Sequence, residues 1–153
     1  MSSQEPVISK ELTRELKQIE SFCPGYTLRR AQKVVSRLFE ASFRDARITS
    51  SQFAILLTLA VNQPLSTGTL SEQLSSEVST VTRNMQALDR LGLVRTEPGT
   101  DKRFRDYRLT EAGVQSLDDN LPRWKEAQTE TMDRVGRLRW MAMLGGLKNL
   151  YES

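Results

Sequence analysis

Apolar positions recur with a helical period through most of the chain, most clearly between residues 77 and 91. Four apolar residues there fall on one side of a helix: Val78, Val81, Met85 and Leu88. The pattern then changes, because two short strand-like stretches, 93–97 and 104–109, flank a turn that begins with Pro98-Gly99. The sequence therefore predicts a helix, with Ser76 as its cap, that leads directly into a β-hairpin.

Two further helices are predicted near the N-terminus. Ser9 can cap the first of them, and Pro24 and Gly25 interrupt it, since these residues in succession mark a turn. Thr27 is expected to cap the second helix, which runs to about Asp45.

The middle of the chain predicts two more helices. Thr49 and Gln52 match a capping box, and the nearly all-apolar stretch 53–60 behind them is expected to be the centre of the core. The segment Ser66–Leu74 predicts a short helix with its leucines facing inward, and Ser75-Ser76 forms the turn into the helix at 77–91.

The C-terminal part of the chain is also predicted to be helical. Thr110 can cap a long helix from about Glu111 to Arg134, Gly136 interrupts it, and a last helix runs from about Arg137 to Tyr151. The predicted fold class is mainly α with a small β-hairpin.

The helix at 77–91 and the hairpin together suggest a function. Side chains that are short or cationic lie opposite the apolar stripe of the helix: Ser79, Thr80, Arg83, Ala87 and Arg90. Such a face can enter a DNA major groove, or it can simply be solvated. The basic hairpin tip, with Lys102, Arg103 and Arg105, favours DNA, since two short helices followed by such a hairpin form a winged helix-turn-helix.

Composition narrows the alternatives. The 153 residues carry a net charge of only +3, so the local clustering of basic residues in the hairpin matters more than the total. The chain has no histidine and one cysteine, which argues against a disulfide framework, a metal site and most enzyme mechanisms. We expect a protein that is not an enzyme and needs no cofactor. With neither a signal-peptide pattern nor a membrane-spanning apolar run, we expect a cytoplasmic location.

Several motifs resemble the MarR family of transcriptional regulators, over roughly Thr27 to Gln128. The stretch Leu74–Arg83 resembles the family's recognition helix, and Leu91-Gly92-Leu93-Val94 is similar to the turn into its wing. The Asp-x-Arg at 101–103, followed by the Leu-Thr at 109–110 that opens the next helix, resembles the family's wing pattern.

The resemblance implies an obligate homodimer with intertwined termini and two winged domains that bind a pseudo-palindromic double-stranded operator. It also implies a repressor that is released from DNA by a small phenolic or aromatic ligand, or by oxidation of a cysteine. On this basis the chain divides into dimerisation helices at 1–48, a DNA-binding module at 49–110 and further dimerisation helices at 111–153. A winged helix that serves only protein contacts is the alternative from another class.

The predicted DNA contacts differ in kind. Ser79, Thr80 and Arg83 are assigned to the major groove; Thr82 belongs to the family motif but lies nearer the apolar stripe, where it can bond locally. Arg103 at the hairpin tip is the candidate for the minor groove. Lys102 and Arg105 are expected to contact phosphates, which adds affinity without sequence information.

Cys23 is a second candidate site. Its place before a dimerisation helix resembles the family's organic-hydroperoxide sensors, and Tyr26, Arg29 and Arg30 could favour its thiolate if they fold over it. Two departures argue against that role: Pro24-Gly25 follows directly, and Phe39 stands where those sensors carry a tyrosine. The cysteine can equally be a small buried hydrophobe.

The sequence does not identify the effector pocket. Trp124, Trp140, Met141 and Met143 could line one, but aromatic and methionine residues at helical spacing are more often plain core.

Overall fold

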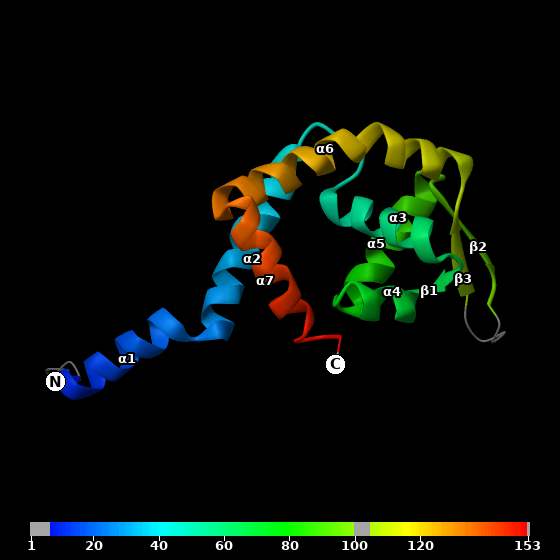
Figure 1. The fold of residues 1–153 in the computed structure, drawn as a ribbon. Coiled ribbons are helices and arrows are strands. Elements are labelled where there is room, and N and C mark those ends of the chain that lie inside the picture. The colour runs from blue at the N-terminus through cyan, green and yellow to red at the C-terminus, as the bar shows by residue number, and fades with distance from the viewer. Residues whose placement is uncertain (1–6, 100–104, 153) are drawn as a thin grey trace, which may run out of the picture. The chain divides into compact units, whose positions relative to one another are not determined.

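The computed structural model describes residues 7–99 and 105–152, which divide into two compact units at the bond between Arg37 and Leu38. Most of the described residues are helical, and a small antiparallel sheet is the other regular element (Figure 1). The helices are α1 (Lys10–Phe22), α2 (Pro24–Ser42), α3 (Ser50–Asn62), α4 (Thr67–Gln73), α5 (Val78–Arg90), α6 (Glu111–Val135) and α7 (Arg137–Lys148), and the strands are β1 (Leu65–Ser66), β2 (Val94–Pro98) and β3 (Arg105–Leu109). The predicted mainly α fold with a small hairpin is confirmed. In the part of the chain described, no helix is long and apolar enough to cross a bilayer.

The N-terminal unit contains α1 and most of α2. Ser9 caps α1 by accepting a hydrogen bond from the Leu12 N–H at 3.2 Å, as predicted. The predicted cap at Thr27 is wrong, because α2 already begins at Pro24, and the Thr27 N–H donates to the Cys23 carbonyl within its first turn. Proline suits the first helical position, where its fixed φ fits the helix and its missing N–H would lack a partner anyway.

The core of the C-terminal unit is centred on α3, as the apolar run at 53–60 predicted. Its side chains at four positions are almost completely buried: Phe53, Ile55, Leu56 and Leu59. They are enclosed by Leu70 of α4, by the inner face of α5 and by the paired strand residues Val94 and Leu109. The capping box at its start is also confirmed, since Thr49 and Gln52 bond each other's backbone N–H groups.

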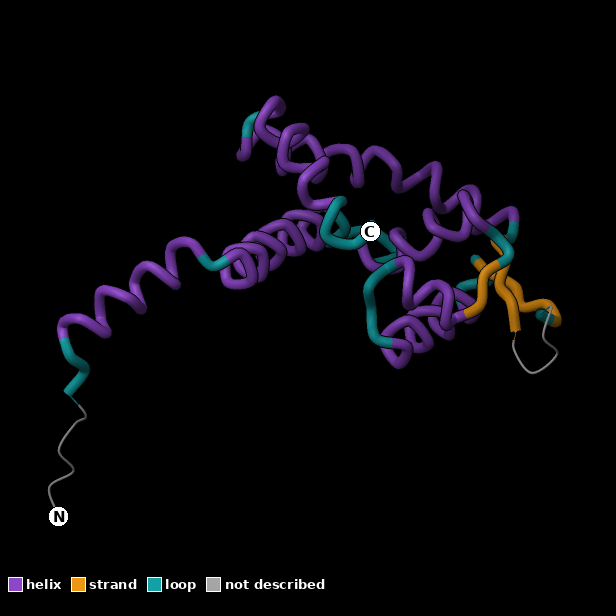
Figure 2. The backbone as a smooth tube through the Cα atoms, turned by 60° about the horizontal axis from the view of Figure 1, so that its bottom comes forward, coloured by secondary structure: helices purple, strands orange, loops and turns teal. Residues whose placement is uncertain are grey.

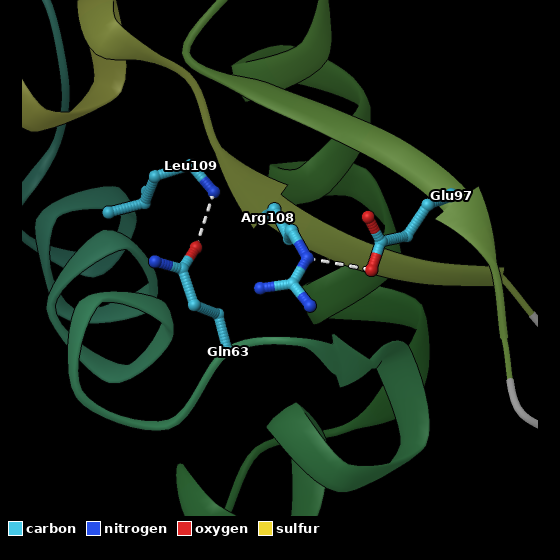
Figure 3. Close-up of polar contacts among 4 residues, drawn as sticks. All are labelled: Gln63, Glu97, Arg108 and Leu109. Carbon is cyan, nitrogen blue, oxygen red and sulfur yellow. Dashed lines mark hydrogen bonds and ion pairs between the residues drawn. The ribbon is translucent and has the colours of Figure 1, made fainter.

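The sheet has the order β1-β3-β2, and its three strands lie together at one end of the C-terminal unit (Figure 2). The strand β1 was not predicted. Its pairing of Leu65 with Tyr107 and of Ser66 with Asp106 would, if continued, bring Gln63 opposite Leu109. Pro64 interrupts the strand there, and the Gln63 side chain instead accepts the hydrogen bond from the Leu109 N–H at 2.8 Å (Figure 3).

Helix α6 begins at the predicted cap Thr110 and packs against α3 through aromatic side chains. The Trp124 ring lies 5.0 Å from Phe53 and 4.5 Å from Phe39, measured between centroids, so Trp124 is part of an aromatic core cluster. Reciprocal hydrogen bonds join Ser42, at the end of α2, to Arg123. Gly136 then separates α6 from α7 with a φ of +89°, a conformation that glycine adopts readily.

Candidate nucleic-acid interface

The turn between α4 and α5 sets the direction of the candidate recognition helix. Ser75 adopts a left-handed conformation with a φ of +47°, and the Ser76 N–H donates to the Ser71 carbonyl at 2.9 Å. Ser76 is not the cap that the sequence suggested, because its hydroxyl donates to the Leu74 carbonyl. Glu77 is the N-cap residue and makes no side-chain capping bond, so α5 starts one residue later than predicted.

The inner face of α5 holds it against the core. Val81, Met85 and Leu88 are at most 1% exposed, which confirms three members of the predicted stripe. Val78 is wrong as the fourth, since 55% of it is exposed. It is the first residue of the helix, and side chains there lean towards the N-terminal end, beyond the edge of the core.

The outer face of α5 gathers the residues predicted for the major groove. Ser79, Thr80 and Arg83 are all exposed, and within residues 7–99 and 105–152 the Arg83 guanidinium forms no hydrogen bond or ion pair. Thr82 is half-buried, in line with its expected position nearer the stripe. Asn84, which the sequence reading did not single out, flanks this face and donates to the Thr80 carbonyl at 3.1 Å. The helix therefore presents hydroxyls and an exposed guanidinium, the donors that read base edges and phosphates.

One face of the hairpin formed by β2 and β3 carries charged side chains. Arg95 pairs with Arg108, and Glu97 with Asp106, so like charges stand directly opposite one another. A diagonal contact relieves this arrangement, since Arg108 Nε donates to Glu97 Oε1 at 2.7 Å (Figure 3). This pair was not predicted from the sequence, although the alternation of charged and apolar residues along both strands could have indicated it.

The basic tip of the hairpin is only partly described. Arg105 is exposed and pairs with Pro98 at the last described step of the ladder. The predicted contacts Lys102 and Arg103 lie outside the described residues. The roles of Lys102, Arg103 and Arg105 in DNA binding stay predictions.

Cys23 is partly buried and is the C-cap residue of α1. Tyr26 and Arg30, two of the residues that could favour the Cys23 thiolate, interact with each other. The Arg30 guanidinium lies 5.7 Å from the centroid of the Tyr26 ring. Phe39, at the position where peroxide sensors carry tyrosine, contacts Trp124 in the core. A sensing role for Cys23 stays a prediction.

Comparisons with known proteins agree with this architecture. A MarR family model matches residues 48–103, which contain α3, α4, α5 and β2. The transcriptional regulator MosR of Mycobacterium tuberculosis, solved in complex with DNA, is 29% identical, with a TM-score of 0.71 over 85% of this chain and 94% of that chain. Comparison with curated protein sequences gave no match.

Two other structures share the fold at lower identity. BpsR of Bordetella bronchiseptica is 20% identical, with a TM-score of 0.77 over 87% of this chain and 96% of that chain. MarR of E. coli is also 20% identical, with a TM-score of 0.70 over 83% of this chain and 96% of that chain. The chain thus matches a MarR family model within its DNA-binding module, and its fold is similar to the folds of solved regulators of that family.

Proposed function

We propose that this protein is a dimeric DNA-binding transcriptional repressor with no catalytic role. The observation that carries the proposal is the outer face of α5, where Ser79, Thr80 and Arg83 are exposed on a helix whose opposite face is fixed in the core. A rigid helix with short polar side chains and an exposed guanidinium can approach base edges closely. A helix serving only protein contacts would have no need of a basic hairpin beside it.

The DNA contacts are divided between α5 and the hairpin. We assign base readout to Ser79, Thr80 and Arg83, with Thr82 in a supporting position at the edge of that face. Arg103 is assigned to the minor groove, where a narrow A·T-rich segment attracts a guanidinium. Lys102 and Arg105 are assigned to phosphates, which supply affinity on any sequence.

Similar structures support both the proposed DNA binding and the proposed release by a small effector. MosR, the more similar of the three structures named above, was solved with DNA bound. DNA binding by BpsR is regulated by 6-hydroxynicotinic acid. By analogy we propose that a small aromatic molecule releases this repressor from DNA. We also propose that the repressor acts in the cytoplasm, the compartment that holds the chromosome.

Apolar side chains that are exposed in the single chain support the proposal of a dimer. Large hydrophobic residues are exposed in the single chain on α1 and, separately, on α7; they include Leu12, Leu16 and Ile19 on the first and Leu138, Met141 and Leu144 on the second. We propose that residues 1–48 and 111–153 form the dimerisation regions and that residues 49–110 form the DNA-binding module.

Selection of DNA from a random duplex library by the purified protein tests this function. Two symmetric recognition helices should enrich a pseudo-palindrome with half-sites about 10 bp apart, centre to centre. A hydroxyl-radical footprint on the enriched duplex should show protection on one face, repeated in each half-site. Enrichment of no common sequence, with equal binding to every duplex, would contradict a sequence-specific repressor.

A further inference from the structure

Val78 is an apolar residue at the start of the candidate recognition helix that the core does not cover. Within α5, all of whose residues the structure describes, it is the only large hydrophobic residue with an exposed side chain. A single exposed apolar side chain is ordinary on a protein surface, so the exposure alone indicates no function. The position of Val78 matters more, because it directly precedes Ser79 on the helix to which base readout is assigned.

The backbone at the start of α5 holds Val78 in a fixed place. The Glu77 carbonyl accepts hydrogen bonds from the N–H groups of Thr80 and Val81, each at 3.0 Å, and Val81 is itself buried in the core. A valine side chain in a helix also has one strongly preferred rotamer. Little conformational freedom is therefore lost when the methyl groups of Val78 meet a bound surface.

The direction of the Val78 side chain places it at the end of α5. Side chains on a helix lean towards its N-terminus, and Val78, as the first helical residue, has no preceding helical turn of α5 to cover. In a helix-turn-helix, the N-terminal residues of the recognition helix are those that contact base edges in the major groove. The methyl groups of Val78 thus lie at the end of the helix that approaches the bases.

The chemistry of this helix end does not suit a phosphate. Val78 has no side-chain donor, and the neighbouring Glu77 side chain is an exposed carboxylate that makes no capping bond. Among residues 7–99 and 105–152, Glu77 also forms no ion pair. Its negative charge repels phosphates and offsets the positive end of the helix dipole. Base edges are therefore the part of the duplex that this end of α5 can contact favourably.

The major groove presents one apolar group among its base edges, the C5 methyl group of thymine. We propose that Val78 recognises a thymine in each half-site of the operator through that methyl group, an inference that rests on the proposed function. The contact is stabilised because both apolar surfaces leave water. A cytosine in the same place lacks the methyl group and presents an amino donor that valine cannot pair. Val78 thereby favours thymine without forming a hydrogen bond.

This contact differs in kind from those assigned to Ser79 and Arg83, which depend on hydrogen bonds and charge. The salt dependence of DNA affinity comes from cations that neutralise phosphates. Removal of a methyl group changes no charge on either partner, so the free-energy difference between thymine and its demethylated analogue should not depend on salt. A salt-independent preference for the methyl group therefore distinguishes Val78 from the cationic contacts.

Replacement of thymine by deoxyuridine in the selected operator tests this recognition, because deoxyuridine lacks only the C5 methyl group. The library is made of unmodified DNA, so the methyl group in question is that of thymine and not of 5-methylcytosine. Each thymine is replaced together with its symmetric partner, and competition gel shifts with the full-length protein give the ratio of thymine to uracil affinity. At one such pair the ratio should be about fourfold for each thymine replaced, the effect of one buried methyl group.

Variants assign that ratio to a residue. In Val78→Ala the ratio at the sensitive pair should fall to about one, since the two changes remove the same contact. Val61→Ala, which shortens an exposed valine of α3 outside this face, is the control and should keep the parent ratio. Thermal unfolding verifies that both variants are folded.

Three outcomes would overturn recognition by Val78 while the selected operator leaves the proposed function standing. These are an operator with no uracil-sensitive thymine, a ratio that is the same in the parent and in Val78→Ala, and a ratio that falls as salt is raised. A parent protein that selects no operator would instead overturn both the proposed function and the role of Val78.

Discussion

Arg83 carries much of the proposed specificity, because it is the one cation at the centre of the exposed face of α5. Replacing it by alanine should cost about 1–3 kcal/mol on the selected operator and much less on random duplexes, since base contacts are lost only on the specific site. Competition gel shifts at a fixed salt concentration measure both affinities. An equal loss on both kinds of duplex would mean that Arg83 contacts only phosphate.

The hairpin tip separates two kinds of contact. Arg103→Ala should cost about 1–3 kcal/mol on the operator if the guanidinium enters a minor groove. Lys102→Ala should instead weaken every sequence alike and reduce the salt slope of the logarithm of the binding constant by about one, as for a lost phosphate contact. Affinities measured at several salt concentrations distinguish them. If Arg103→Ala binds like the parent, the hairpin does not read this DNA.

Ser75 stores backbone strain in the helix-turn-helix. Its φ of +47° lies in the left-handed region, where a side chain is disfavoured and glycine is not. Ser75→Gly should therefore raise the free energy of unfolding by on the order of 0.5–1 kcal/mol. Urea unfolding measures the change. Ser76→Gly is the control and should destabilise, because it removes the hydroxyl that donates to the Leu74 carbonyl.

At the scale of elements, the start of α6 is fixed to the turn after α5 by close packing. A Cβ on Gly113 would overlap the backbone carbonyl oxygen of Leu93, which cannot move without disturbing its bond from Thr110. Gly113→Ala should lower the free energy of unfolding by about 1–3 kcal/mol, the usual cost of overpacking. In Gly68→Ala, an added methyl group meets only ordinary contacts, so this matched control should unfold close to the parent in urea.

Helix starts were predictable from the sequence where a side-chain cap acts locally. Ser9, Thr49 and Thr110 each accept a hydrogen bond from an N–H three residues ahead, a pattern that is complete within a few residues of sequence. Thr27 and Ser76 failed because a competing local feature starts the helix elsewhere: Pro24 in the first case, and the left-handed turn at Ser75 in the second.

Features that depend on distant pairing were not predictable in the same way. The two-residue strand β1 exists only because β3 returns beside it from about 40 residues later. The Arg108–Glu97 contact likewise depends on the register of the hairpin. Within the candidate DNA face, by contrast, the exposure of Ser79, Thr80 and Arg83 followed from helical periodicity alone.

At the scale of the whole molecule, association should depend on apolar side chains that the single chain leaves in water. Light scattering at micromolar concentration should give twice the chain mass of 17.4 kDa. Leu138→Glu should shift that mass towards the monomer, because Leu138 is 84% exposed in α7 and a charge there opposes burial. Val61→Glu, at an exposed position in α3 within the proposed DNA-binding module, is the control and should leave the dimer intact. A parent protein that stays monomeric would contradict the architecture.

The hydrogen bond that the Gln63 side chain accepts should affect how readily sheets of neighbouring molecules pair at high concentration. By accepting from the Leu109 N–H, it occupies the sheet edge just where β1 stops, and Pro64 beside it offers no N–H. An incoming strand from another molecule therefore finds only the two residues of β1 to pair with on that side. Such a short, blocked edge is a poor template for edge-to-edge growth, so this side of the sheet should resist aggregation even at high local concentration.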